Sequence, residues 1–246
     1  MPYLNIEKYY RKALECDVLS GYYKYSNPSL SLHYHEKHLA YLKQAARQAR
    51  QQVASGRIRI LHSSKTAPGQ LDIYVNGSIM FSGISFKQIT SPLSLPRANY
   101  FLEVYEAGQQ KINLAAAAFT ILPGQETTLA LAGHSANFRI MPIQDSSNVP
   151  EGETRIRFVH LTPRLATVDI AVSGGDVLFH DISYKDCTEY MALVPMSADL
   201  AMRHTGTREV ILDIPRQLFS PNKSYTYYII PSNESPIKAE MIKAEA

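Results

Sequence analysis

Hydrophobic residues follow two different periods along this chain of 246 residues. After residue 56, apolar side chains alternate with polar ones, as at Leu71, Ile73 and Val75, and this period of two predicts half-buried strands. Residues 1–56 instead carry apolar residues three and four positions apart, which predicts helices. We therefore expect a mainly β protein that is preceded by an N-terminal α-helical segment.

The β region contains an internal repeat at a spacing of 98 residues, from Arg57 to Arg155. RIRILH at 57–62 recurs as RIRFVH at 155–160, and LDIYVNG at 71–77 recurs as VDIAVSG at 168–174. A match that runs through the whole segment indicates two copies of one structural unit. Further paired positions are Phe81 and Phe179, Ile84 and Ile182, Leu102 and Leu200, Gly108 and Gly206, and Pro123 and Pro221.

Turn residues divide each repeat into short strands. Asn76-Gly77 tolerates the positive φ angles of a tight hairpin, and Ser173-Gly174 takes its place in the second repeat. About seven strands at this spacing are typical of an immunoglobulin-like or transthyretin-like β-sandwich. We expect two tandem sandwich domains, residues 57–145 and 155–246, with polar, turn-rich residues 144–152 between them.

The motif that recurs in the two repeats resembles a known bacterial family. The run of Arg, hydrophobic, Arg, two hydrophobic residues and His at 57–62, followed by DIYVNG at 72–77 and by ISF at 84–86, is similar to domain of unknown function 4397. The resemblance covers residues 57 to about 231. It implies tandem β-sandwich modules, often in surface-associated proteins, and it carries over no catalytic residue.

Residues 1–56 are predicted to form two helices. Asn5 is expected to cap a first helix that runs to about Tyr23, and Ser26-Asn27-Pro28 separates it from a second helix over about 29–53. An apolar seam on the second helix predicts an interface, either with the first sandwich or with the same helix of another molecule. The predicted interface residues are Leu39, Leu42, Ala46, Ala49 and Val53.

Composition and charge exclude several classes of function. The net charge is +3. The positive charge lies in residues 1–56, which contain eight Lys or Arg and four Asp or Glu. We interpret these basic residues as a solvated helix face rather than a nucleic-acid site. No segment reaches the ~20 apolar residues of a membrane span, and the N-terminus lacks the apolar run of a signal peptide. The expected location is the cytoplasm, or a cell or spore surface reached without that signal.

Repeated polar residues are predicted to be structural. His62 and His160 share a strand face with apolar residues, whereas Asp72 and Asp169 lie on the opposite face of theirs, so no His-Asp pair is implied. Each histidine is expected to be buried, neutral and bonded to a backbone group. The paired arginines at 57, 59, 155 and 157 are expected to point outward and protect an edge strand, or to contact an anion.

No local motif predicts catalysis, a cofactor site or a metal site. His33, His35 and His38 do not converge on one face of a helix, because they differ by two and three positions at 100° per residue. Cys16 and Cys187 do not form a disulfide framework, and Cys187 is expected to be a small core-side residue.

The sequence as a whole therefore predicts a non-enzymatic protein that acts through protein contacts. The expected role is structural, assembly or scaffolding, including at an envelope or spore surface, with a protein partner or self-association through the helices. The alternative is a module that binds a glycan, a peptide or a polyanion through tyrosines or outward arginines.

Overall fold

The computed structural model describes residues 3–53, 55–67, 69–134, 137–232 and 239–245. Two helices are followed by strands arranged in four-stranded sheets, which confirms the mainly β architecture expected from the sequence. Contacts group the chain into two compact units. One comprises Met1–Gly56, Leu95–Ala98 and Ile121–Gly124, and the other comprises Arg57–Ser94, Asn99–Thr120 and Gln125–Ala246.

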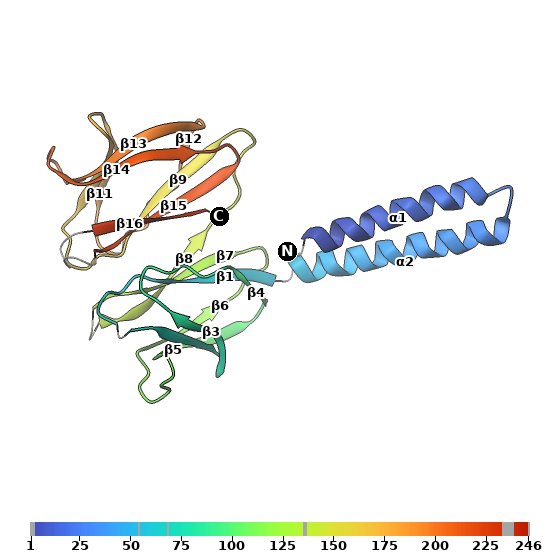
Figure 1. Ribbon diagram of the computed structural model, residues 1–246, viewed down its shortest axis with the longest axis horizontal. Coiled ribbons are helices and arrows are strands. Elements are labelled where there is room, and N and C mark those ends of the chain that lie inside the picture. Colours follow the sequence, from blue (N-terminus) through green and yellow to red (C-terminus); the bar gives the residue numbers. More distant parts are fainter. Residues whose placement is uncertain (1–2, 54, 68, 135–136, 233–238, 246) are drawn as a thin grey trace. The chain divides into compact units, whose positions relative to one another are not determined.

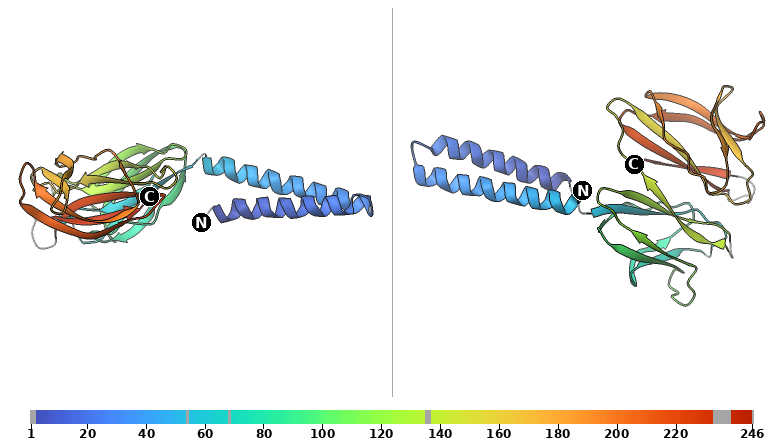
Figure 2. Two further views of the ribbon diagram at one scale, coloured as in Figure 1. Left: turned by 90° about the horizontal axis from the view of Figure 1, so that it is seen from above. Right: turned by 180° about the vertical axis from the view of Figure 1, so that it is seen from behind.

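The N-terminal helices α1 (Tyr3–Tyr23) and α2 (Pro28–Val53) lie side by side as an antiparallel hairpin (Figures 1 and 2). The Leu30 backbone N–H donates to Asn27 Oδ1 at 3.1 Å, so Asn27 caps α2 while Pro28 occupies its first position. The expected break at 26–28 is therefore confirmed. The expected cap at Asn5 is wrong, because α1 already begins at Tyr3.

The first sandwich, called sandwich 1, consists of two sheets with strand orders β4-β1-β7-β8 and β3-β2-β5-β6. Strands β1 and β7 pair in parallel, and the other adjacent pairs whose register is assigned are antiparallel. The strands are β1 (Ser55–His62), β2 (Leu71–Val75), β3 (Ser78–Ile84), β4 (Leu93–Pro96), β5 (Asn99–Glu106), β6 (Ala115–Thr120), β7 (Glu126–Ala132) and β8 (Arg139–Asp145).

The second sandwich, called sandwich 2, repeats this order strand for strand, with sheets β12-β9-β15-β16 and β11-β10-β13-β14. Each described repeat thus has eight strands rather than about seven. The strands are β9 (Thr154–His160), β10 (Val168–Val172), β11 (Val177–Ile182), β12 (Met191–Leu193), β13 (Met196–His204), β14 (Val210–Phe219), β15 (Lys223–Pro231) and β16 (Ala239–Glu245).

Strand register is also equivalent in the two sandwiches. Ile73 pairs with Phe81 across β2 and β3, and Ile170 pairs with Phe179 across β10 and β11. The turn at Asn76-Gly77 has φ values of 49° and 77°, as its sequence predicts. The internal repeat therefore corresponds to two tandem β-sandwiches.

The central strands of the two sandwiches are buried on both faces. One face of β9 fills the core of sandwich 2, where Phe158 packs against Phe179 and Tyr227. The opposite face forms a second apolar cluster that contains residues of both repeats. Its buried members are Leu61, Ala130, Ala132, Ile143, Val159, Leu161, Tyr228, Ile230 and Ala244.

Candidate functional site

The helical hairpin is held together by small and polar residues. The Ser20 hydroxyl donates to the Ser31 carbonyl at 3.1 Å, and the Ser31 hydroxyl donates to the Ser20 carbonyl at 2.8 Å. His38 Nδ1 donates to the Ala13 carbonyl at 2.9 Å, and Ala13 and Ala45 are buried. The contact face of α2 therefore runs through residues 31, 34, 38, 41 and 45.

The hairpin leaves a second, apolar side exposed. Tyr10, Leu14 and Val18 follow one another on α1 with exposures of 48%, 65% and 72%, and Leu32 and Leu39 on α2 are 60% and 44% exposed. At 100° per residue both stripes are displaced in the same rotational sense from the contact face, by roughly 110–130°. Because the helices are antiparallel, both stripes lie on the same side of the hairpin. We call these five residues the hairpin face.

Part of the predicted seam on α2 belongs to this exposed side. Leu39 and Ala46 are exposed, and Leu42 and Ala49 are half-buried. The side chain of Val53 lies outside the described residues. The helix therefore packs a neighbouring stripe against α1, a partner that we did not consider, and this stripe contributes the Ser31 and His38 hydrogen bonds and the ring contacts of Tyr34 and Tyr41.

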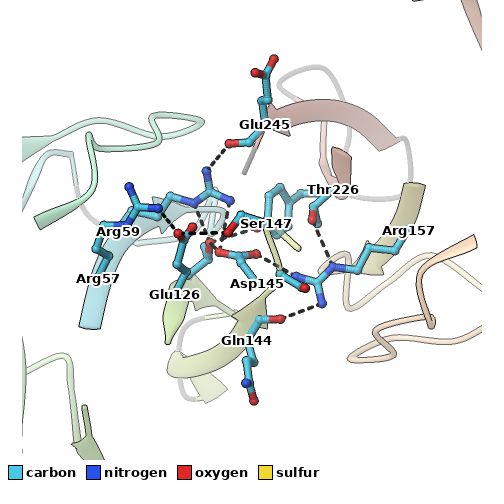
Figure 3. A network of polar contacts seen from close by, with 12 residues as sticks. Arg57, Arg59, Glu126, Gln144, Asp145, Ser147, Arg157, Thr226 and Glu245 are labelled. Carbon is cyan, nitrogen blue, oxygen red and sulfur yellow. Dashed lines mark hydrogen bonds and ion pairs between the residues drawn. The ribbon is translucent and has the colours of Figure 1, made fainter. Parts of the chain in front are cut away.

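A buried ion-pair network joins the two sandwiches (Figure 3). Asp145, at the end of β8, accepts from Arg59 Nη2 at 3.2 Å and from Arg157 Nη2 at 2.7 Å. Arg59 Nε donates to Thr128 and Arg157 Nε donates to Thr226, and these two threonines are equivalent in the repeats. One carboxylate therefore neutralises part of the charge of two arginines from different repeats.

Backbone carbonyls complete the network, and they accept from equivalent atoms of the two arginines. Arg59 Nη1 donates to the Glu245 carbonyl at 3.0 Å, and Arg157 Nη1 donates to the Gln144 carbonyl at 2.8 Å (Figure 3). Each arginine thus reaches the last strand of the other repeat. Since all the groups are paired within the chain, the arrangement is suited to fixing one sandwich against the other.

The outward-arginine prediction is wrong for Arg59 and Arg157, which are 8% and 5% exposed. Strands β1 and β9 are interior strands of their sheets, so they need no edge protection. Only Arg57 is exposed, and it pairs with Glu126. A pocket of about 100 Å³ beside Arg57, Arg59 and Asp145 is below the roughly 300 Å³ of ordinary small-molecule sites.

His62 and His160 are fully buried at the ends of equivalent strands. The Thr162 N–H donates to His160 Nδ1 at 3.2 Å, whereas neither ring nitrogen of His62 has a partner among the described residues. Burial lowers the pKa of His62 to about 4 and also lowers the pKa of His160. Both rings are therefore neutral at physiological pH, with a backbone bond only in His160.

Asp72 and Asp169 receive equivalent sets of backbone N–H groups. Asp72 accepts from Gly83 and Gly108, both at 2.9 Å, and Asp169 accepts from Asp181 at 2.9 Å and from Gly206 at 3.1 Å. Burial by itself would raise the pKa of each carboxyl, but these hydrogen bonds outweigh it and lower the pKa. The two carboxylates hold turns and β-bulges in place and do not contact the histidines in any bond described.

The other candidate groups do not form a site in the described residues. The rings of His35 and His38 stack at 6.2 Å, His33 contacts Tyr34 instead, and no group of three metal-ligating residues converges there. Cys187 is exposed rather than core-side, because it follows a turn and forms only an isolated bridge to Val159. Among the described helices, none has the length and apolar character needed to cross a membrane.

Fold and site together define a tandem β-sandwich protein that carries a two-helix hairpin. Residues 56–171 match the model of the family described as Domain of unknown function (DUF4397). The resemblance seen in the sequence is thus confirmed for sandwich 1 and for β9 and most of β10. No curated protein matches the chain.

Solved structures show only weak similarity. The C-terminal domain of AlgF from P. aeruginosa is 11% identical, with 40% of this chain and 100% of that chain covered and a TM-score of 0.30. The CBM26 module of Eubacterium rectale Amy13K is 10% identical, with 78% and 97% covered and a TM-score of 0.25. The Bacillus anthracis TIE protein is 13% identical, with 78% and 41% covered and a TM-score of 0.25.

Proposed function

We propose that this is a non-enzymatic assembly protein, and that the hairpin face is its docking surface for a second molecule of the same chain. The observation that carries the proposal is the exposure of five large apolar side chains on one side of the hairpin: Tyr10, Leu14, Val18, Leu32 and Leu39. Apolar patches that monomers leave exposed commonly mark protein contacts.

A second hairpin fits this surface better than an extended ligand does. A two-helix hairpin buries only one side of each helix, and a four-helix bundle buries the remaining apolar stripes around a shared core. A two-fold axis places Leu14 and Val18 of one molecule opposite the same apolar side of the other, so each contact is made twice. The many tyrosines of the helices suit such an interface, since their rings are apolar and their hydroxyls tolerate water.

Charge reversal on the hairpin face tests the proposal. The double variant Leu14→Glu/Val18→Glu should convert the assembly to a smaller species in light scattering, while circular dichroism shows unchanged helix content because both side chains point away from α2. The matched control Val194→Glu/Leu218→Glu changes two exposed apolar side chains of the β region, 73% and 61% exposed, and should leave the size unchanged. A wild-type protein that is monomeric at all concentrations would refute self-association.

The domain boundaries are part of the same proposal. Residues 57–145 and 155–246 are proposed as two sandwich domains that fold without residues 1–56. A chain that starts at Gly56 should give a cooperative unfolding transition and a folded, smaller species. Insolubility or loss of the β signal in circular dichroism would place the helices in the folding unit of the β region.

The alternative is a binding module for a glycan, a peptide or a polyanion. The pairing of Arg59 and Arg157 with Asp145 leaves these two arginines unsuited to a polyanion. Specific binding in a screen of glycans, extended peptides and heparin-like polyanions, unaffected by Leu14→Glu/Val18→Glu, would favour the alternative. Fractionation of cells and spores with an antibody would test the expected cytoplasmic or surface location.

A further inference from the structure

Strand β6 forms an edge of sandwich 1 with an unusual composition for an edge. The order β3-β2-β5-β6 leaves one side of β6 without a hydrogen-bonded strand neighbour in the described chain, although β8 of the facing sheet lies close to β6. Its sequence, Ala115-Ala116-Ala117-Ala118-Phe119-Thr120, contains no charge and no proline. Nearby Phe101 and Ile112 are 47% and 72% exposed, so the edge is also apolar.

Alternate residues of β6 direct their backbone groups away from β5. The Ile121 N–H donates to the Ala98 carbonyl at 2.9 Å, and pairing continues without a shift from Thr120 opposite Asn99 to Ala115 opposite Val104. In an antiparallel ladder, residues that bond to the neighbour alternate with residues that bond outward. The N–H and C=O groups of Ala116, Ala118 and Thr120 therefore point to the open side.

The equivalent strand of sandwich 2 is protected against pairing. Strand β14 carries Asp213, Pro215 and Arg216, and the positive φ of 52° at Arg216 accompanies shifts of register against β13. Charges, proline and bulges are the means by which natural sheets prevent edge-to-edge contact. The other described edge strands use at least one of them: β3 and β11 are bulged, β4 and β12 are short, and β8 and β16 carry charges.

We propose that β6 is a strand-pairing site, and that its occupant is β6 of a second molecule, antiparallel and centred on Ala118. In this register Ala118 faces its own symmetry mate, Ala116 faces Thr120, and Ala117 faces Phe119 on the other surface. No charges meet, and each aromatic ring lies opposite a small residue. The sheets β3-β2-β5-β6 of the two molecules would then form one continuous sheet.

Self-pairing explains the features of the strand better than capture of another extended segment does. An isologous contact requires that a strand be complementary to itself when reversed, and an uncharged run of small residues meets this condition. Open N–H and C=O groups supply the bonds, and β14 shows that the same scaffold accepts protective residues at this position.

The pairing is independent of the hairpin contact that we propose as the main assembly interface. Two different isologous contacts on one chain generate assemblies larger than dimers, either closed or extended. A chain with both contacts should therefore be larger than a dimer, and a chain that has lost one contact should be a dimer.

Charge on the β6 edge tests the proposal by sedimentation equilibrium of the full chain. We expect Ala118→Lys to reduce the wild-type assembly to a dimer, Leu14→Glu/Val18→Glu to reduce it likewise, and the combined variant to be a monomer. The matched control Leu218→Lys places the same charge on the protected edge β14, where the residue is 61% exposed, and should change nothing. Far-ultraviolet circular dichroism checks that each variant is folded.

Cysteine cross-linking tests the register. In a background of Cys16→Ser and Cys187→Ser, Ala118→Cys should form an intermolecular disulfide under mild oxidation, because opposed Cα atoms in such a pair are about 5.5 Å apart. Ala116→Cys is the matched control and should not, since it faces Thr120.

The outcomes separate the two contacts. If Ala118→Lys sediments like the wild type while the hairpin variant becomes smaller, or if Ala118→Cys cross-links no faster than Ala116→Cys, the β6 pairing is refuted and the hairpin proposal stands. If only Ala118→Lys reduces the size, the β6 pairing stands and the hairpin proposal fails.

Discussion

Sandwich 1 and sandwich 2 share strand order, register and turn chemistry, yet they differ at three places. Asp145 of sandwich 1 forms an ion pair with one arginine of each repeat. His160 has a backbone partner that His62 lacks. Strand β14 is bulged and charged, whereas β6 is neither.

The comparison distinguishes residues that stabilise the shared fold from residues that give each repeat its own surface contacts. Two pairs of residues that both copies keep, Asp72 with Asp169 and Arg59 with Arg157, make equivalent contacts in both, whereas the kept pair His62 and His160 does not. Two of the three differences lie at a sheet edge or between the sandwiches, where each repeat meets a different neighbour. The following predictions test this division, from the largest expected effect to the smallest.

Loss of the single shared carboxylate should have the largest effect. Asp145→Asn keeps the shape of the side chain but leaves two buried arginines without a counter-charge, and removal of one partner of a buried ion pair costs about 3–5 kcal/mol. Urea unfolding should show this loss. Glu126→Gln, which disrupts the more exposed pair with Arg57, is the control and should cost less than about 1 kcal/mol. Equal effects of the two variants would mean that the network does not stabilise the β region.

Acid should destabilise the fold through His62. The unfolded chain binds a proton at this residue near pH 6.5, whereas burial lowers the folded pKa to about 4. The stability contributed by the neutral ring is therefore complete above pH 6.5 and is lost as the pH falls toward 4, by up to about 3 kcal/mol. His62→Gln should remove this part of the pH dependence in urea unfolding from pH 8 to pH 4.

Replacement of His62 and of His160 should lower the free energy of unfolding by different amounts at neutral pH. His160→Leu leaves the buried Thr162 N–H without its acceptor, which costs about 1–3 kcal/mol beyond any change in packing. His62→Leu leaves no described group unpaired, so it should cost less at pH 8. The reverse order would show that the environment of His62, not His160, contains the more important polar contact.

Asp72→Asn and Asp169→Asn should have similar effects, about 1–3 kcal/mol each, because each removes a charged acceptor from two backbone N–H groups. The hydrogen bonds lower both pKa values below the ordinary 3.8. Their contribution is thus complete above pH 3.8 and disappears as the pH falls further, below the His62 window. Clearly unequal losses would break the equivalence of the repeats.

The smallest change in stability is expected from substitutions in the β-bulges whose backbone N–H groups bond to these carboxylates. Gly83 has φ 65°, and its counterpart Asp181 has φ 54°. Gly83→Ala should cost about 1 kcal/mol from conformation, because an added Cβ would meet only the Gln70 side chain at 3.6 Å. Asp181→Gly should change stability by less than about 1 kcal/mol, since relief of the left-handed conformation offsets the greater freedom of the unfolded chain.

Local features were predictable from the sequence because they depend on neighbouring residues. The turn at Asn76-Gly77, the break before Pro28 and the alternation of β2 all appear in the structure. The burial of Arg59 and Arg157 was missed, although the short apolar run 227–230 carried a signal that β15, the neighbour of β9, is covered on both faces. The predicted number of about seven strands per repeat was one too low, and proline or charged residues interrupt the apolar alternation of β8 and β16.

The sequence by itself determined the period of each segment, the repeat and the turns, since side-chain direction and backbone conformation are set within a few residues. Only the tertiary structure decided which stripe of α2 meets α1 and which face of β1 and β9 is covered. It also decided that one carboxylate lies between two arginines 98 positions apart in the chain. These contacts join residues distant in sequence, and their free energy depends on burial and pairing that no local pattern encodes.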